Sequence, residues 1–277
     1  MSIFTCPVCG EMLGVSGKSL VCPQRHSFDT AKSGYVNLLL SKHGTTVHGD
    51  NKLMLKARRD FLEKGYYTPL CAEVCKTVVK YAENGSTILD AGCGEGYYTS
   101  AVKAIFDRSN IAVNMYGIDI SKEAVDMAAK RRSGIRFAAA SVFHIPVKSE
   151  SCDILLTMFA PYCGEEYGRV LKDGGIMVMV IPSENHLWEL KSLIYDTPYK
   201  NEVKPYALEG FEFLGSERIN FVMCINDKSD IQSLFSMTPY YYKSGRVEQQ
   251  RLGSLELLET QADFEILTYK KSQSSAS

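Results

Sequence analysis

The sequence predicts an α/β domain with a doubly wound, Rossmann-like sheet, preceded by a small metal-binding module. From residue 87 onward, short apolar strands alternate with helical segments, as they do in βαβ units. A glycine-rich stretch lies where the first of these strands should turn into the first helix. The first 26 residues, finally, contain cysteines and a histidine at the spacing of metal ligands.

The front module contains four candidate zinc ligands. Cys6 and Cys9 are separated by two residues, Cys22 and His26 by three, and twelve residues lie between the two pairs. Zinc favours four tetrahedral sulfur and nitrogen ligands, and a closed set of this kind leaves no open position for catalysis. The alternative is a group of ordinary buried or redox-active cysteines. Because so short a segment buries little core, we expect one structural Zn²⁺ to supply much of its folding energy.

Composition gives weaker indications of class and partners. The 277 residues are 45% hydrophobic and 23% charged, which is ordinary for a soluble globular protein. We find neither an apolar run long enough to span a bilayer nor a leader at Met1, so we expect a cytoplasmic protein without a membrane partner. Residues 1–70 carry nine Lys or Arg against five Asp or Glu, although the net charge of the chain is −1. A basic front suggests an anionic partner, and a chance imbalance of surface charge is the alternative.

The elements before the sheet predict where one part ends and the next begins. After the metal module (1–40), the polar stretch 41–50 is expected to be a linker, followed by a helix over 51–63 in which apolar residues recur every four positions. Gly65 should end that helix, and Thr68-Pro69 should open the next, which runs to Gly85. We therefore expect a zinc module at 1–40, a linker and helix at 41–67, and the main domain at 68–277.

Within the main domain the strands and helices alternate. The predicted strands are 87–90, 115–119, 135–139, 153–158 and the fully apolar 176–181, and helices are predicted at 97–106 and 122–131. After Pro182 the pattern weakens to a helix at 187–194, strands within 211–225 and a last strand at 264–269. The polar tail 272–277 is predicted to be disordered.

The glycine-rich loop predicts a binding site for a cationic small molecule. Its glycines allow a tight turn and let the backbone approach a ligand closely. A pyrophosphate ligand would be served by basic groups and helix-end amides, whereas this loop is acidic. The candidate contacts in the loop, with Asp90 just before it, are Gly92, Gly94, Glu95 and Gly96.

Asp119 is a second candidate contact. It ends the second strand, 23 residues after Gly96, where a carboxylate can accept hydrogen bonds from both hydroxyls of a ribose. The alternative is that Asp119 is the N-cap of the helix that starts near Lys122.

The loop from Asp90 to Gly96 resembles motif I of the class I S-adenosylmethionine methyltransferases. Nearly the whole chain further resembles the RlmA-type 23S ribosomal RNA guanine-N1 methyltransferases, through the stretches 22–29, 34–38, 57–59, 94–98 and 237–239. This resemblance implies a class I methyltransferase domain behind a zinc module, S-adenosylmethionine as methyl donor, and a hairpin of 23S ribosomal RNA as substrate. It also favours a homodimer.

The resemblance implies further site residues. Tyr67 and His186 match positions that touch the methyl donor, Ser141 follows the third strand where such enzymes place the adenine, and 158–161 follows the fourth strand where they place the acceptor. The alternatives are that Tyr67 is a packed aromatic at a helix edge and that His186 is a helix cap or a surface histidine. No residue of the acceptor loop is an obvious general base.

The predicted function is therefore transfer of a methyl group from S-adenosylmethionine to N1 of a guanine in a hairpin loop of 23S ribosomal RNA. The front is expected to select the RNA through phosphate contacts, for which the candidates are Lys18, Arg25, Lys32, Arg58 and Arg59. A methyltransferase that acts on another RNA or on a small molecule, and a non-enzymatic zinc protein that binds RNA or another partner, are the alternatives. Neither a small-molecule enzyme nor a binding protein needs both a basic zinc module and an intact donor loop.

Overall fold

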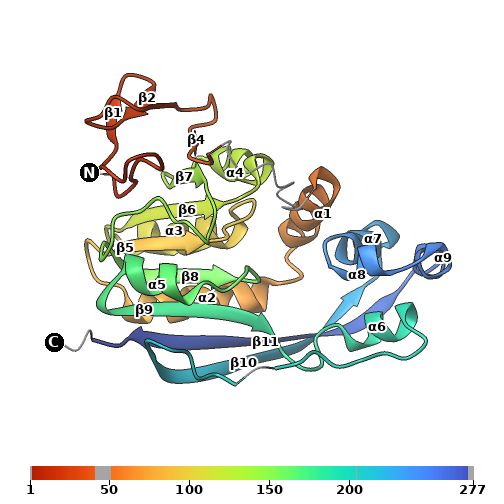
Figure 1. Ribbon diagram of the computed structural model, residues 1–277. Helices are drawn as coiled ribbons and strands as arrows, with labels where there is room; N and C mark the ends of the chain where they lie inside the picture. Colours follow the sequence, from red (N-terminus) through yellow and green to blue (C-terminus); the bar gives the residue numbers. More distant parts are fainter. Residues whose placement is uncertain (1, 41–50, 204, 274–277) are drawn as a thin grey trace.

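The computed structural model describes residues 2–40, 51–203 and 205–273 (Figure 1). The predicted linker at 41–50 and the last four residues of the predicted disordered tail lie outside the described residues. A three-stranded antiparallel sheet near the N-terminus is formed by β1 (Gly14–Ser16), β2 (Ser19–Val21) and β3 (Ser27–Asp29).

The main sheet of the described residues has eight strands. In the described part of the chain its strand order is β10 (Phe211–Ile225), β11 (Leu258–Lys271), β9 (Leu171–Pro182), β8 (Cys152–Met158), β5 (Thr87–Ala91), β6 (Asn114–Asp119), β7 (Arg136–Ala139) and β4 (Val36–Asn37). The strands from β9 to β4 are parallel to one another, β11 is antiparallel to β9, and β10 is antiparallel to β11. The predicted doubly wound class is confirmed.

The strand order reverses at β5, which lies between β6 and β8. In open α/β sheets, ligands bind beyond the carboxyl ends of the strands at such a switch point. The residues after β5, β6, β8 and β9 therefore meet at one edge, and the glycine-rich loop after β5 lies at its centre. β10 and β11 are longer and more regular than the sequence pattern indicated, because they pair with each other over almost their full length.

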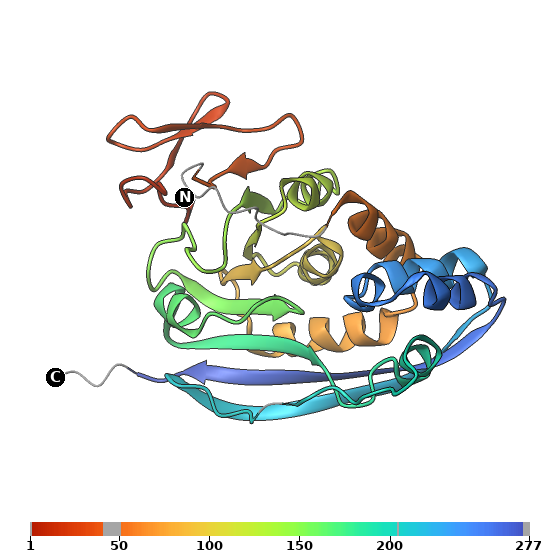
Figure 2. The same ribbon diagram turned by 45° about the vertical axis from the view of Figure 1, so that its right-hand side comes forward.

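Helices cover both faces of the sheet (Figure 2). One face carries α2 (Thr68–Tyr81), α3 (Tyr97–Arg108) and α4 (Lys122–Ala129), and the other carries α5 (Gly164–Val170). The remaining helices are α1 (Lys52–Glu63), α6 (Trp188–Ile194), α7 (Lys228–Ser236), α8 (Tyr240–Lys243) and α9 (Arg246–Gly253), and α1 packs against α7. None of the helices in the described ranges is long and apolar enough to cross a membrane.

The front module is docked on the sheet rather than tethered beside it. Phe4 is only 2% exposed, forms a β-bridge with Val147, and contacts Tyr116 of β6 edge to face at 5.4 Å between ring centroids. Cys6 and Cys22 belong to the same buried cluster, and β4 extends the main sheet by pairing with β7. The module therefore shares a hydrophobic core with the larger domain.

Candidate functional site

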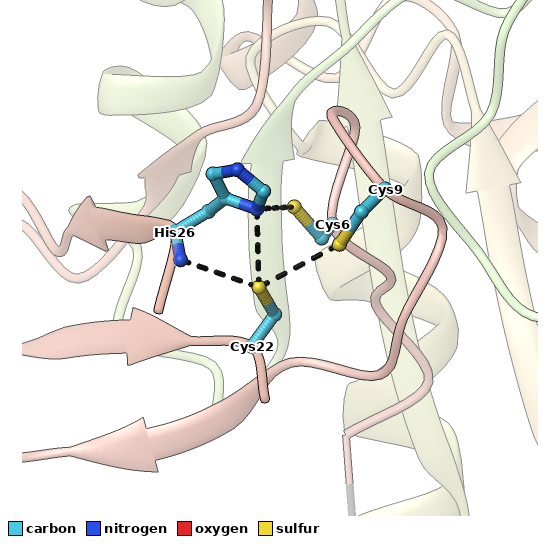
Figure 3. Close-up of side chains that lie close together, drawn as sticks. All are labelled: Cys6, Cys9, Cys22 and His26. Atoms are coloured by element: carbon cyan, nitrogen blue, oxygen red, sulfur yellow. Dashed lines mark hydrogen bonds between the residues drawn. The ribbon is translucent and has the colours of Figure 1, made fainter. Parts of the chain in front are cut away.

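The four predicted metal ligands converge at one point (Figure 3). The ligand atoms of Cys6, Cys9, Cys22 and His26 all lie within 4.8 Å of one another. The Nδ1 atom of His26 is 3.3 Å from the Cys22 sulfur and 3.6 Å from the Cys6 sulfur, and the Cys9 and Cys22 sulfurs are 3.6 Å apart. Around a tetrahedral zinc, bond lengths of about 2.0–2.3 Å put neighbouring ligand atoms roughly 3.5–3.8 Å apart. The donor set thus fits zinc in both chemistry and spacing.

Tight turns aim each pair of ligands. The amide of Gly10 donates to the Cys6 carbonyl at 2.8 Å, and Gly10 has a φ of 78° that favours glycine. In the second pair the amide of Arg25 donates to the Cys22 carbonyl at 2.8 Å, and the amide of His26 donates to the Cys22 sulfur at 3.3 Å. Such amide–sulfur bonds hold and tune thiolate ligands.

The glycine loop is shaped by two close approaches. At Gly92, where φ is 91°, a Cβ atom would lie 2.4 Å from the Cβ of Ala160, and at Gly96, where φ is 80°, it would lie 2.8 Å from the Cβ of Ala128. Gly94 differs, because the nearest atom to its hypothetical Cβ is Nη1 of Arg58 at 3.9 Å. Gly92 and Gly96 thus let the loop pack closely against the segment that follows β8 and against α4, whereas Gly94 faces open space.

Two buried carboxylates give the loop its acidic character. Asp90 accepts a hydrogen bond from Thr99 at 2.5 Å through Oδ2, and Glu95 pairs with Arg131 through Oε2. Among the described residues, neither Oδ1 of Asp90 nor Oε1 of Glu95 has a hydrogen-bond partner, although both are buried. Burial raises the pKa of Asp90 to about 7 against the opposing bond from Thr99. Orphaned carboxylate oxygens at this loop fit a donor that carries ammonium and sulfonium charges.

Asp119 holds the loop from the neighbouring strand. Its Oδ2 accepts the amide of Gly94 and its Oδ1 accepts the amide of Ser121, both at 2.9 Å. The alternative role as N-cap is wrong, since Ser121 caps α4 by accepting the amide of Ala124 at 3.2 Å. Ser141 follows β7 and is half-buried, and its hydroxyl accepts the amide of Phe143.

Tyr67 and His186, which are far apart in sequence, meet at Phe264. The Tyr67 ring contacts Phe264 edge to face at 5.0 Å, the His186 ring lies 4.4 Å from Phe264, and Tyr67 and His186 are 6.3 Å apart. Tyr67 is also packed against Phe61, as its alternative proposed. His186 is 8% exposed and precedes Leu187, the N-cap of α6, so the alternatives of a surface histidine and a helix cap are wrong.

Several residues of this edge escaped the sequence analysis. Thr99 and Arg131, which bind the two acidic side chains, lie on α3 and just after the C-cap of α4, and they belong to no motif. Phe159 follows β8, and Phe264 lies in the middle of β11. Thr99 lies in the first turn of the helix that follows the glycine loop, and this position could have been inferred from the sequence. Nothing in the sequence links Phe264 to Tyr67.

Comparison with known proteins decides the family. Residues 4–44 match the RlmA N-terminal zinc ribbon, and residues 82–236 match a methyltransferase domain. A Bacillus subtilis protein, provisionally named a 23S rRNA (guanine-N(1)-)-methyltransferase, is 32% identical over 276 residues, covering 96% of each chain. The chain belongs to the 23S rRNA (guanine-N1) methyltransferase family. The 23S rRNA (guanine(748)-N(1))-methyltransferase of Streptomyces fradiae is 33% identical over 221 residues, 77% of each chain.

Membership of this methyltransferase family confirms three predictions: the resemblance itself, the class I methyltransferase fold and the zinc module. The family's zinc ribbon and the four-ligand cluster together indicate a structural zinc. The methyltransferase domain implies S-adenosylmethionine as the donor, and the glycine loop at the switch point has the shape and charge that such a donor requires.

Proposed function

We propose that this protein transfers the methyl group of S-adenosylmethionine to N1 of a guanine in a hairpin loop of 23S ribosomal RNA. The observation that carries the proposal is the relationship to the Bacillus subtilis protein along nearly the full length of both chains, zinc ribbon included. A methyltransferase specific for a small molecule has no evident need for that ribbon.

We assign the donor to the edge of the sheet around β5. Gly92, Gly94 and Gly96 let the loop wrap the donor, and Asp90 and Glu95 face its positive charges. Asp119 accepts the ribose hydroxyls, and the backbone beside Ser141 borders the adenine. Tyr67 and His186 close the methionine end. This assignment is supported by the shared edge and by the buried, orphaned oxygens.

The donor supplies a methyl group on a positively charged sulfur, which needs no further activation. The protein's part is to orient the acceptor nitrogen in line with the methyl carbon and the sulfur, and to exclude water. N1 lies on the Watson–Crick edge of guanine, so a paired base must first leave its stack. Hairpin loops offer unpaired bases, which proteins read by stacking and hydrogen bonds to base edges.

We further propose a division of labour in which residues 1–40 select the RNA, 41–67 connect, and 68–277 perform the transfer. Lys18, Arg25 and Lys32 are exposed on the front module, and Arg59 is exposed on α1. Arg58 lies over Gly94 and so is closer to the donor than to the module. Phosphate contacts by the exposed residues would give affinity without base specificity.

Two broader assignments complete the proposal. We place the enzyme in the cytoplasm, where ribosomal RNA is made and modified in bacteria, and we propose a homodimer. The outer edge of β10 supports the dimer, since Phe213 and Val222 are 39% and 65% exposed on this long edge strand. Light scattering of the purified protein tests the oligomeric state.

The test of function uses unmodified 23S ribosomal RNA and isotopically labelled S-adenosylmethionine. Primer extension maps the product, because a methyl group at N1 blocks base pairing and stops the polymerase. A stop at one guanine, absent without the donor, is the expected result. Labelling of another RNA, or of no RNA at all, would contradict the proposal.

A further inference from the structure

Phe159, the residue that follows β8, has an unusual backbone and an unusual exposure. Its φ is 56°, a left-handed conformation that bulky residues rarely adopt, and its side chain is 48% exposed. The conformation is held by its amide, which donates to the Val180 carbonyl at 3.2 Å, and by its ring, which packs on Phe264 at 5.6 Å. Strain that the surrounding structure maintains in this way is concentrated at functional sites.

Phe159 belongs to the segment 158–161, which starts at the end of β8 and adjoins the glycine loop 92–96. Ala160 is so close to Gly92 that a Cβ atom on this glycine would overlap it, at 2.4 Å. The next carbonyl, that of Pro161, accepts a hydrogen bond at 2.8 Å from the hydroxyl of Tyr167, a fully buried residue of α5. The half-exposed ring of Phe159 is thus fixed beside the loop to which we assign the methyl donor.

His186 has a defined tautomer. The amide of Asp263 donates to its Nδ1 at 3.2 Å, so Nδ1 carries no proton and the neutral ring carries its proton on Nε2. Burial, reinforced by the nearby charge of Lys191 and opposed by Asp263, lowers the pKa of His186 to about 3. The ring is therefore neutral at physiological pH. Within the described ranges, Nε2 has no hydrogen-bond partner, which leaves this N–H for a ligand.

Phe159 and His186 both contact Phe264, so they lie close together at this edge of the sheet. A ring for stacking and a neutral N–H donor are what a protein needs to hold a flipped purine. The N–H of His186 would also distinguish guanine from adenine. Guanine presents a carbonyl oxygen at position 6 that can accept this hydrogen bond, whereas adenine presents an amino group that cannot.

We propose that the acceptor guanine stacks on Phe159 while His186 donates its Nε2–H to O6, a role that rests on the function proposed above. As the N1–H bond breaks, the proton passes to water and its electron pair is delocalised onto O6, where His186 stabilises the negative charge. N1 then forms a bond to the methyl carbon. The carbon–sulfur bond breaks at the same time, and its electron pair goes to sulfur to give S-adenosylhomocysteine. A neutral donor suits this step, since it need not lose its own proton.

The experiment compares paired variants of the full-length protein. His186→Phe keeps an aromatic ring without the N–H, and His186→Gln restores an acceptor and a donor. Phe159→Leu removes the stacking ring and Phe159→Tyr keeps it, both at the same backbone strain. Phe213→Leu, on the distant β10, is the control for losing an exposed aromatic residue. For each variant, donor affinity is measured by calorimetry, and kcat and KM are measured on the ribosomal hairpin across a pH series.

We expect His186→Phe to lower kcat by about 10²–10³-fold. Donor affinity should stay within a few-fold of wild type, because the phenyl ring preserves the packing at the methionine end and only the N–H is lost. The rising limb of its pH–rate profile should move to higher pH, because N1 loses its proton less readily, and His186→Gln should recover part of both effects. Phe159→Leu should raise the KM for the hairpin roughly 5- to 150-fold, with Phe159→Tyr near wild type.

Three outcomes would overturn the inference. In the first, His186→Phe loses activity only in proportion to donor affinity, which would make His186 a donor contact alone. In the second, its kcat falls without any change in the pH profile, the mark of lost packing. In the third, Phe159→Leu behaves as Phe213→Leu does. Failure of the proposed function is distinguishable from all three, because it would show in the wild-type protein as the absence of N1-methylguanine.

Discussion

The metal module and the sheet edge around β5, to which we assign methyl transfer (the transfer edge), differ in how far apart in sequence their residues lie. All four zinc ligands come from 21 consecutive residues, and short turns aim them at one point. The transfer edge instead draws on residues from Tyr67 to Phe264, brought together by the parallel sheet and by the antiparallel return of β11. The module is a local structure that metal completes, whereas the edge exists only after the whole domain has folded.

The two regions also differ in charge and exposure. The module presents exposed lysine and arginine side chains around a partly buried ligand cluster, whereas the edge is lined by buried carboxylates and aromatic rings. An exposed basic surface suits a polyanion, and a buried acidic one suits a small cation. Losses in the module should therefore affect RNA selection, and losses at the edge should affect donor binding and catalysis.

The largest effect is expected from Cys22→Ser. Structural zinc contributes roughly 10–16 kcal/mol of apparent binding energy in small zinc modules. Zinc content should fall from one ion per chain to nearly none, and hydrogen exchange should show that β1 to β3 lose protection while donor affinity changes little. Cys224→Ser, at an exposed cysteine outside the cluster, is the matched control. Full retention of zinc would show that the four side chains do not act as one ligand set.

Gly94→Val should damage the other region alone. At a φ of 54° a left-handed valine costs about 1–2 kcal/mol of stability, and its side chain fills the space assigned to the donor. Calorimetry should show donor affinity reduced by on the order of 100-fold or more. Gly134→Val carries similar strain, at a φ of 74° with nothing within 4 Å of its Cβ. If both variants bind the donor equally well, the open space at Gly94 is not the donor site.

Asp119→Ala tests the strand beside the loop. Removing the carboxylate takes away the acceptor that we assign to the ribose hydroxyls and leaves the amide of Gly94 without its partner. Hydrogen bonds to charged groups contribute roughly 1.5–3 kcal/mol, so donor affinity should fall about ten- to 150-fold. Ser121→Ala removes the cap of α4 and should cost about 1 kcal/mol of stability with affinity kept. Unchanged affinity in Asp119→Ala would reduce Asp119 to a brace for the loop.

Asp90 predicts a pH dependence of both stability and donor binding. Its pKa is raised from 3.8 to about 7, so without donor the stability it contributes is present below its ordinary pKa and is lost as pH rises through about 7. A cationic donor binds the ionised form better, and its affinity should rise up to about tenfold per pH unit below 7. Asp90→Asn should abolish both trends in calorimetry and denaturant titrations. A wild-type affinity that is flat from pH 5.5 to 7.5 would contradict this prediction.

The same contrast explains what the sequence revealed. The zinc ligands and the glycine loop were predictable because each is a contiguous motif whose spacing specifies its chemistry. The partners of the loop were not: Arg131 lies 36 residues after Glu95, and its contact depends on how α4 packs. Phe264 belongs to a strand whose length the pattern underestimated, because pairing with β10 and not local periodicity sets its extent. Residues joined only by tertiary contacts leave no local signal.

The smallest effect is also the most direct test of the division of labour. Deleting residues 1–40 would uncover Tyr116 and remove β4 from the main sheet, so a truncated chain would confound RNA binding with stability. The full-length double variant Lys18→Glu/Lys32→Glu avoids this. Each phosphate contact on a single strand releases roughly 0.7 counterions, and the variant loses two such contacts. The slope of log affinity against log salt should therefore become about 1.4 less steep.

The control is the double variant Lys76→Glu/Lys270→Glu, which makes the same change in net charge outside the module. Lys76 and Lys270 are exposed on α2 and β11, away from the module, and their reversal to Glu should leave the slope near that of wild type. Donor affinity should be unchanged in both double variants, since none of these lysines borders the glycine loop. Because screening weakens the field of distant charges, only residues that touch phosphates alter the slope by whole counterions. Equal flattening in both variants would mean that overall charge steers the RNA, and that the zinc module is a structural brace on the sheet.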